Sequence, residues 1–422
     1  MNFQDLIYTK RDGGVLSEEQ IRWFIDKFTK NEIPDEQAGS FLMAVFFRGL
    51  NKEELNVWTD AMIKSGEKLD LSKVGKPTVD KHSTGGVGDK ISLPLCPLVA
   101  SFGAAVPQLS GRGLGTFGGT LDKMESVSGF NISLSNDQMI NQLKNVGVFI
   151  TAAGVGLAPA DRKMYSFRDV IGAVECIPLI ASSIMSKKIA EGTQSLVLDV
   201  KAGRGAFMKD FAKAKQLAET MVEIGNNAGV KTVALITQME TPLGNAVGNA
   251  LEVSESIDVL NGKGPSDVIE ITLALAKEML TLAGIDKDPA EGLKNGSAFN
   301  VWKNMIKAQG GNPDAEIPMA KKKEFILANK SGYITDLNAY SIGLSAWRLG
   351  AGRAKKEDAV SKTAGIMCLA KEGDFVEKDQ PVLELHIDDE TRINSAKDAL
   401  LNAFEIGPEP KEKRKIVLER IS

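Results

Sequence analysis

Residues 79–92 read VDKHSTGGVGDKIS and indicate a short strand, a loop of hydroxyls and glycines, and the start of a helix. Such a loop exposes several backbone N–H groups at a helix N-terminus, where an anion binds favourably. Lys81 adds a positive charge, and Ser83 and Ser92 add hydroxyl donors. An isolated glycine loop is more often a plain turn, but the lysine, histidine and hydroxyls of this one favour a phosphate site.

A second glycine cluster reads SGRGLGTFGGTLDKMES at residues 110–126 and follows the apolar run AAVPQL, which we expect to be a strand. Loops that leave parallel strands of one sheet meet at its carboxyl edge and can share a ligand. Gly113, Gly115 and Gly118 also fit the dinucleotide pattern G-x-G-x-x-G. That pattern is weak alone, and two further glycines blur its context, so NAD binding is the less favoured interpretation.

A third group of polar side chains lies in a helical insert. Arg168 stands in MYSFRDV, and Ser183 and Lys187 are four residues apart, so these two share one face of a helix. Taken alone, the group is typical of a solvated basic face. The same side chains can also hold the oxygens and ring nitrogen of a pyrimidine and stabilise negative charge on a departing base.

The chain contains two histidines, His82 and His386. A lone histidine is more often a structural residue than a catalyst. His82 stands between Lys81 and Ser83, both candidate phosphate ligands, whereas His386 lies in a C-terminal extended segment. His82 is therefore the better candidate for a general acid.

Signatures of several other enzyme classes are missing from the sequence. Lys90 follows Asp89 and precedes Ile91, so the first loop is not the P-loop of an ATPase. We find no Ser-His-Asp order, no H-E-x-x-H motif and no Cys-x-x-Cys pair. We therefore expect neither hydrolase nor zinc chemistry, and no protein-bound metal.

The pattern of apolar residues and glycines along the sequence predicts three domains. Residues 1–68 show helical spacing of apolar side chains, and we expect the insert at 160–193 to pack on them. Short apolar strands alternate with glycine loops and helices over 75–159 and 194–330, which is typical of an α/β domain with a mostly parallel sheet. Residues 331–422 predict a small β-rich, α+β C-terminal domain.

Composition argues against two classes of partner. Lys plus Arg total 51 against 55 for Asp plus Glu, so a net charge of -4 provides no overall positive field for nucleic acid or an anionic membrane. The N-terminal residues lack an apolar signal region, and no apolar run approaches a membrane span. Cys96, Cys176 and Cys368 are odd in number and far apart, so we expect free thiols and a cytoplasmic protein.

The three groups of residues, in this order and spacing, resemble the thymidine and pyrimidine-nucleoside phosphorylase family over essentially the whole chain. The resemblance implies the three domains above, a homodimer, and no cofactor besides the co-substrate phosphate. It assigns phosphate binding to Lys81, Ser83, Ser92, Ser110 and Thr120. It assigns base binding to Arg168, Ser183 and Lys187, with the apolar pocket residues Leu114, Tyr165, Ile180 and Phe207. It assigns the catalytic roles to His82, Arg168 and Lys187.

Two sites depart from the family pattern. Thr116 and Phe117 stand where members usually carry His-Thr. Gln108 stands where thymidine-selective members carry Met and broader members carry Lys. The choice between thymidine and uridine therefore stays open.

Some broader members bind a potassium ion, and Lys90 argues against that ion here. The ion's ligands match Gly88, Leu243, Ala246 and Glu255, together with a hydroxyl residue where this chain has Lys90. We hypothesise that the Lys90 ammonium replaces the ion and pairs with Glu255.

The resemblance implies reversible phosphorolysis, in which thymidine and phosphate give thymine and 2-deoxyribose 1-phosphate. A broad pyrimidine-nucleoside phosphorylase that also uses uridine is one alternative. A phosphoribosyltransferase of related fold is another, although residues 199–210, DVKAGRGAFMKD, offer no paired acids for magnesium-pyrophosphate chemistry. A non-catalytic binding protein is the third, and the intact set of polar site residues argues against it.

Overall fold

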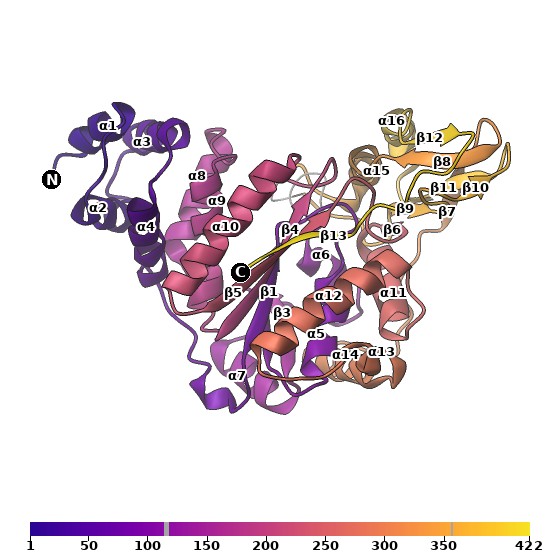
Figure 1. The fold of residues 1–422 in the computed structure, drawn as a ribbon, viewed down its shortest axis with the longest axis horizontal. Coiled ribbons are helices and arrows are strands. Elements are labelled where there is room, and N and C mark those ends of the chain that lie inside the picture. The colour runs from indigo at the N-terminus through magenta and orange to yellow at the C-terminus, as the bar shows by residue number, and fades with distance from the viewer. Residues whose placement is uncertain (114–117, 356–357) are drawn as a thin grey trace.

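The computed structural model describes residues 1–113, 118–355 and 358–422. N-terminal helices, a large α/β domain and a C-terminal β-rich domain follow one another along the long axis of the molecule (Figure 1). This architecture confirms the fold class predicted from the sequence. Within the described ranges, no helix is both long and apolar enough to cross a membrane.

The N-terminal domain consists of α1 (Phe3–Arg11), α2 (Glu18–Thr29), α3 (Asp35–Arg48) and α4 (Lys52–Lys64). Capping boxes at Ser17 and Asn51 start α2 and α4 by satisfying free N–H groups of their first turns. The apolar faces meet in an aromatic core in which Phe24 and Trp58 are fully buried. Ala160, on α8 (Pro159–Val170), belongs to the same core, so the helical insert packs on the N-terminal helices.

The central sheet contains β1 (Val79–Ser83), β2 (Val106–Ser110), β3 (Val148–Ala152), β4 (Ser195–Ala202), β5 (Lys231–Gln238) and β13 (Val417–Ile421). β1, β4 and β5 pair in parallel in that order, and β13 closes the far edge antiparallel to β5. β2 and β3 form a parallel pair. Backbone hydrogen bonds of Ala105 with Pro77 and Val79 place β2 next to β1.

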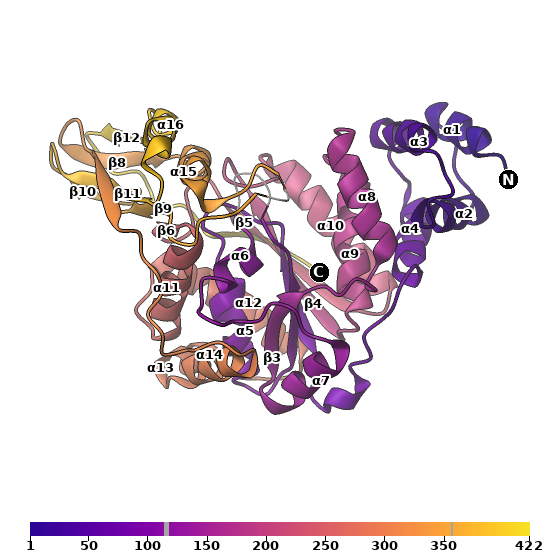
Figure 2. The ribbon, with the colours of Figure 1, turned by 180° about the vertical axis from the view of Figure 1, so that it is seen from behind.

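Helices cover both faces of this sheet. One side carries α5 (Ser92–Ala100), α11 (Asn249–Leu260), α12 (Ser266–Leu282) and α14 (Ser297–Ala308), and the other carries α9 (Ile177–Ala190) and α10 (Phe211–Asn227) (Figure 2). Successive side chains of a strand point to opposite faces of the sheet. Val197 of β4 therefore packs in the core on the side of α5, α11, α12 and α14, and Leu196 and Leu198 pack in the core on the side of α9 and α10. The remaining helices of this domain are η1 (Ser72–Val74), α6 (Thr120–Met124), α7 (Asn136–Asn145) and α13 (Ala290–Lys294).

The C-terminal domain has two small sheets, ordered β6-β9-β11-β7 and β10-β8-β12. Their strands are β6 (Ala246–Val247), β7 (Lys322–Leu327), β8 (Gly332–Leu337), β9 (Gly365–Cys368), β10 (Phe375–Val376), β11 (Pro381–Ile387) and β12 (Phe404–Gly407). The helical segments packed on them are α15 (Ala339–Ala346), η2 (Trp347–Ala351), η3 (Glu390–Arg392) and α16 (Ile393–Ala399).

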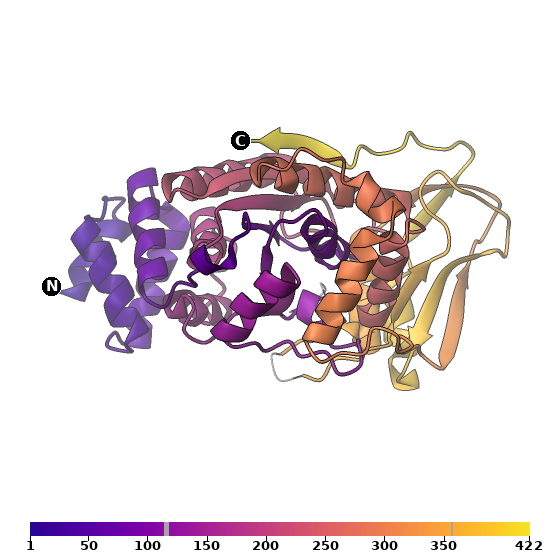
Figure 3. The same ribbon diagram turned by 90° about the horizontal axis from the view of Figure 1, so that it is seen from below.

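The predicted boundary between residues 330 and 331 is wrong in two respects. β7, predicted within the α/β domain, pairs with β11 of the C-terminal domain. β13, predicted within the C-terminal domain, pairs with β5 instead, and Figure 3 shows this last segment returning along the large domain. Strand pairing joins residues far apart in the chain, so the local pattern of apolar and polar residues does not show to which sheet an edge strand belongs.

Candidate active site

The first predicted phosphate loop leaves the carboxyl end of β1. The Nζ atom of Lys81 lies 3.4 Å from the Oγ atom of Ser92, the first residue of α5. Ser83 donates to Asp89 at 2.5 Å and accepts from the N–H of Gly85 at 3.1 Å. The structure thus brings Lys81, Ser83 and Ser92 to the same end of the strand.

The second glycine loop leaves β2 and so emerges beside the first. Ser110 ends β2, and Thr120 begins α6. An ideal Cβ atom on Gly119 would lie 2.0 Å from the backbone nitrogen of Gly113, so only glycine allows the loop to close on itself. Of the five predicted phosphate ligands, Lys81, Ser83 and Ser110 thus lie at the carboxyl ends of β1 and β2, and Ser92 and Thr120 begin the helices that follow. Their role stays a prediction.

Lys123, which our sequence interpretation missed, ties the two loops together. Its buried ammonium donates to the backbone oxygen of Asp89 in the first loop at 2.6 Å and to that of Gly118 in the second at 3.4 Å. It also pairs with Glu252 of α11 at 2.9 Å. The sequence around Lys123 gave no local signal of this role, because a bond to a distant carbonyl leaves no trace in the neighbouring residues.

Lysines dominate the electrostatics of the phosphate loops. Burial alone would raise the pKa of Asp89, but the charges of Lys201, Lys81 and Lys123 hold that pKa well below its usual range. Asp89 is therefore an anion, and Lys201 is neutralised by Asp199 at 2.7 Å. Lys123 is likewise paired with Glu252, whereas Lys81 lies 4.0 Å from Asp199 and 3.4 Å from the Ser92 hydroxyl. Lys81 is therefore the ammonium best placed to attract a second anion.

The predicted base-binding face on α9 is present. Lys187 donates to the Oγ atom of Ser183 at 3.1 Å and pairs with Asp161 of α8 at 2.5 Å. Asp161 is only 3% exposed, whereas the Lys187 side chain is 37% exposed. A buried carboxylate thus orients a partly exposed ammonium. Asp161 was missed, although its spacing of seven residues from Arg168, two helical turns, marks the same face of α8.

Arg168 does not join this face in the structure. Its guanidinium is buried and donates through Nε, Nη1 and Nη2 to the backbone oxygens of Ala173, Leu179 and Val174 at 3.0, 2.9 and 2.6 Å. The side chain thereby holds the turn between α8 and α9. In this conformation it orients the helix that carries Ser183 and Lys187 rather than presenting itself to a ligand.

Lys188, the neighbour of Lys187, fastens α9 to the sheet. Its buried ammonium contacts Asp80 of β1 at 2.6 Å, Glu191 at 2.9 Å and the backbone oxygen of Leu109 of β2 at 3.1 Å. Burial, followed by the nearby negative charge of Asp80, raises the pKa of Glu191 well above its usual range. Of the two carboxyl groups that Lys188 contacts, Glu191 therefore tends to keep its proton.

His82 lies within electrostatic reach of both groups of donors. Burial, and then the charges of Lys188, Lys187 and Lys81, hold the pKa of His82 well below its usual range. The imidazole is therefore neutral near pH 7 in the absence of ligand. A neutral imidazole offers an N–H donor or a ring-nitrogen acceptor, and the role of His82 as a general acid stays a prediction.

The predicted apolar pocket residues are only partly brought together. Ile180 and Phe207 are half-buried in the core shared by α9 and α10, and Tyr165 is 44% exposed on α8. Leu114, like the atypical Thr116 and Phe117, lies outside the described residues.

Gln108, the second atypical position, is buried beneath the phosphate loops. Its amide nitrogen donates to the Oγ atom of Ser110 at 3.2 Å and to the backbone oxygen of Leu109 at 3.1 Å. Its oxygen accepts from the thiol of Cys96 at 3.4 Å. The side chain therefore contacts a predicted phosphate ligand.

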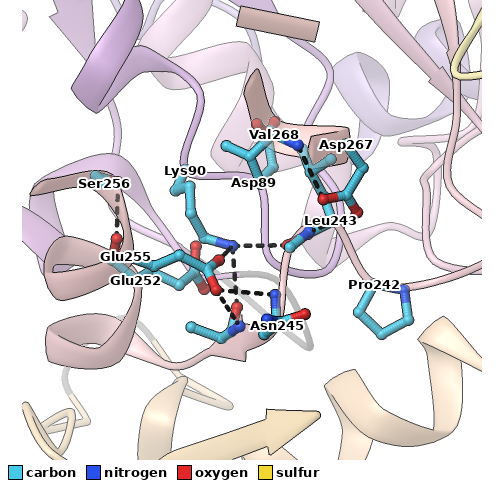
Figure 4. A network of polar contacts seen from close by, with 12 residues as sticks. Asp89, Lys90, Pro242, Leu243, Asn245, Glu252, Glu255, Ser256, Asp267 and Val268 are labelled. Carbon is cyan, nitrogen blue, oxygen red and sulfur yellow. Dashed lines mark hydrogen bonds and ion pairs between the residues drawn. The ribbon is translucent and has the colours of Figure 1, made fainter. Parts of the chain in front are cut away.

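The pair of Lys90 and Glu255 that the sequence predicts is present (Figure 4). The fully buried Nζ atom of Lys90 lies 2.7 Å from Glu255, 2.6 Å from the backbone oxygen of Leu243 and 3.1 Å from that of Ala246. An ideal Cβ atom on Gly88 would lie 2.5 Å from the Leu243 oxygen. Burial opposes the charge, but Glu255 and then Glu252 raise the pKa of Lys90, so an ammonium fills this cage of oxygens.

Comparison with solved structures identifies a similar fold. The anthranilate phosphoribosyltransferase TrpD from Thermus thermophilus superposes with a TM-score of 0.58 at 17% sequence identity, covering 72% of this chain and 99% of that one. At such low identity, the likeness concerns the arrangement of helices and strands alone.

Comparison of sequences is more specific. Residues 4–66 match the glycosyl transferase family helical bundle domain, residues 75–299 its a/b domain, and residues 333–407 the pyrimidine nucleoside phosphorylase C-terminal domain. A thymidine phosphorylase of Mycobacterium tuberculosis is 49% identical over 99% of this chain and 97% of its own length. A pyrimidine-nucleoside phosphorylase of Geobacillus stearothermophilus is 44% identical over the full length of both chains. The chain therefore belongs to the pyrimidine nucleoside phosphorylase family of glycosyl transferases.

Proposed function

We propose that the protein catalyses the reversible phosphorolysis of pyrimidine nucleosides, with thymidine and phosphate giving thymine and 2-deoxyribose 1-phosphate. The relatives named above support this reaction over their full length. The observation that carries it is geometric: Lys188, next to Lys187 of the base-binding face, contacts Asp80 of β1 at 2.6 Å and the backbone oxygen of Leu109, next to Ser110, at 3.1 Å. In keeping with this arrangement, the charges of Lys81 and Lys187 both lower the pKa of His82. Donors for two reactants therefore lie near a single imidazole.

The proposed chemistry needs no covalent nucleophile. Phosphate, held at the ends of β1 and β2, attacks C1′ of the sugar from the face opposite the base while the bond from C1′ to the base nitrogen breaks. Lys187 and Ser183 stabilise the negative charge that develops on the departing pyrimidine. Holding both reactants in line supplies a further part of the rate enhancement.

Neutral His82 fits between these reactants as a hydrogen-bond partner of the substrate. A phosphate dianion beside Lys81 offsets part of the positive charge that lowers the pKa of His82, so phosphate binding raises that pKa toward its usual range. The imidazole then becomes a better proton donor only after phosphate has bound.

Chromatography of free base released from thymidine, deoxyuridine and uridine, each with and without phosphate, tests the proposal. Phosphate-dependent release of thymine with little uracil from uridine is the expected result. Comparable release from all three substrates supports the broad pyrimidine-nucleoside phosphorylase instead. No release from any nucleoside contradicts both, and favours a phosphoribosyltransferase or a binding protein.

We propose further that this activity requires no potassium ion, because Lys90 holds its ammonium among the oxygens of Leu243, Ala246 and Glu255. We expect the turnover rate and the melting temperature to be nearly the same in potassium chloride as in tetramethylammonium chloride. The variant Lys90→Ser, which empties the cage, serves as the contrast and is expected to gain stability from potassium. Strong activation of the unaltered protein by potassium contradicts the proposal.

A homodimer is our proposal for the assembly, and the cytoplasm for its location. Phe47 and Val170 of the helical domain are 74% and 85% exposed, and a second copy that covers them removes this apolar surface from water. Sedimentation velocity of the protein and of Phe47→Glu tests the assembly. The three cysteines are free and buried, which suits a reducing compartment.

A further inference from the structure

An arginine of the C-terminal domain reaches the second glycine loop. Arg353 is 6% exposed, and its guanidinium donates to both carboxylate oxygens of Asp122, through Nη2 at 2.8 Å and Nη1 at 3.2 Å. Nη1 also donates to the backbone oxygen of Gly113 at 3.1 Å. A buried bidentate pair of this kind is directional as well as strong, so it fixes the position of both partners.

Asp122 is the point at which this contact meets the phosphate loop. It lies in the first turn of α6, two residues after Thr120, and accepts the N–H of Gly113 at 2.7 Å. Gly113 in turn lies against Gly119, where no Cβ atom fits. Arg353 and Asp122 therefore clamp together the two ends of the loop that runs from Ser110 to Thr120.

The segment that carries Arg353 is itself held in place. Asn249, the first residue of α11, donates through its amide nitrogen to the backbone oxygens of Ala351 at 3.0 Å and Ser361 at 2.8 Å. A second arginine, Arg112, also reaches Asp122, at 3.3 Å, but its side chain is 45% exposed and pairs more closely with Glu125. Of the two, Arg353 is the contact that water screens least.

We propose that Arg353 is a positioning residue for phosphate: by clamping Asp122 and Gly113, the C-terminal domain sets the distance between Ser110 and Thr120. This inference rests on the proposed function, because it takes those two hydroxyls as phosphate ligands. It assigns the C-terminal domain a part in binding the co-substrate. Nucleoside binding depends instead on Ser183 and Lys187 of α9.

Steady-state kinetics of Arg353→Gln, Arg353→Lys and Arg348→Gln test the inference. Arg348 is the matched control, because it belongs to the same domain but donates to the backbone oxygen of Ser395, away from the loop. For Arg353→Gln we expect the KM for phosphate to rise by about 10- to 100-fold, as for misplaced binding groups, and the KM for thymidine to stay nearly unchanged. Arg353→Lys, which retains a charge but not the planar fork, is expected to restore part of the phosphate affinity.

The possible results separate the clamp from its alternatives. A fall in kcat and melting temperature of Arg353→Gln with an unchanged KM for phosphate overturns the inference, because a purely structural pair lowers the active fraction without altering affinity. Equal effects of Arg348→Gln also overturn it. If Arg353→Gln does not fold, Arg353→Lys carries the same comparison. Absence of phosphate-dependent turnover in the unaltered protein refutes the proposed function itself, and is thereby distinct from a failure of the clamp.

Discussion

Lys187 is the side chain on which the proposed chemistry depends most directly. Its ammonium is oriented by buried Asp161 and bonded to Ser183. Loss of a donor that acts on charge in the transition state costs roughly two to three powers of ten, so Lys187→Ala is expected to lower kcat by about 100-fold or more. Lys52→Ala, which removes an exposed lysine paired with Glu223, is the control and should retain normal turnover. A near-normal rate for Lys187→Ala contradicts the base-binding assignment.

His82 links the site to the pH dependence of stability. Its folded-state pKa lies below the value of about 6.5 expected in the unfolded chain, so the unfolded chain takes up the proton first as the pH falls. The contribution of His82 to stability is therefore complete above about pH 6.5 and is lost as the pH falls toward the folded-state pKa.

Thermal melts of the unaltered protein and of His82→Asn across this window check that sign. We expect the melting temperature of the unaltered protein to fall more steeply below about pH 6.5 than that of the variant, which has no proton to bind. Other titrating groups contribute equally to both proteins and cancel in the difference. A difference in melting temperature that stays constant with pH means that His82 titrates normally.

The attachment of helix α9 to the sheet depends on the charge state of two of its side chains. Lys188→Met removes the partner of buried Asp80 and is expected to lower the free energy of unfolding by about 3–5 kcal/mol. Glu191→Gln is expected to cost only about 1 kcal/mol, because the raised pKa of Glu191 favours a neutral carboxyl that an amide imitates. Urea denaturation measures both, and equal losses for the two variants contradict this division of charge.

Strand β13 decides how the chain as a whole is closed. It covers the edge of β5, Ile416 just before it is buried in the main core, and Glu419 pairs with Lys215 of α10 at 2.6 Å. Removal of residues 416–422 exposes the edge of a parallel sheet, so we expect the melting temperature to fall by at least about 5 °C and aggregation to increase. Calorimetry and light scattering provide the measurements. Deletion of Ser422 alone should leave both unchanged, and an unaltered melting temperature for the longer deletion rules out this role of β13.

Local patterns in the sequence determined the elements, the order of the domains and the family. The capped starts of helices, the glycines that follow β1 and β2, and the spacing of Ser183 and Lys187 along α9 involve residues close together in the chain. Even the contact of Lys90 with Glu255 could be predicted, because the unusual lysine stands at a position where the family resemblance names the surrounding oxygens. Features of this kind can be recognised in the sequence, because each involves either residues close together in the chain or positions that the resemblance to a known family identifies.

Apart from the pair of Lys90 and Glu255, only the tertiary structure decided which buried charges meet. Lys123 joins the two glycine loops, Asp161 orients Lys187, and Arg353 reaches Asp122 from another domain. For Arg168 the structure changed the interpretation. The sequence suggested that its guanidinium binds the substrate, but the fold places three backbone carbonyls around it, at and next to the turn between α8 and α9. The same physical reason applies to Lys123, Asp161, Arg353 and Arg168. A buried charge needs partners, the packing of the folded chain decides where these partners lie, and such packing produces no periodic pattern in the sequence.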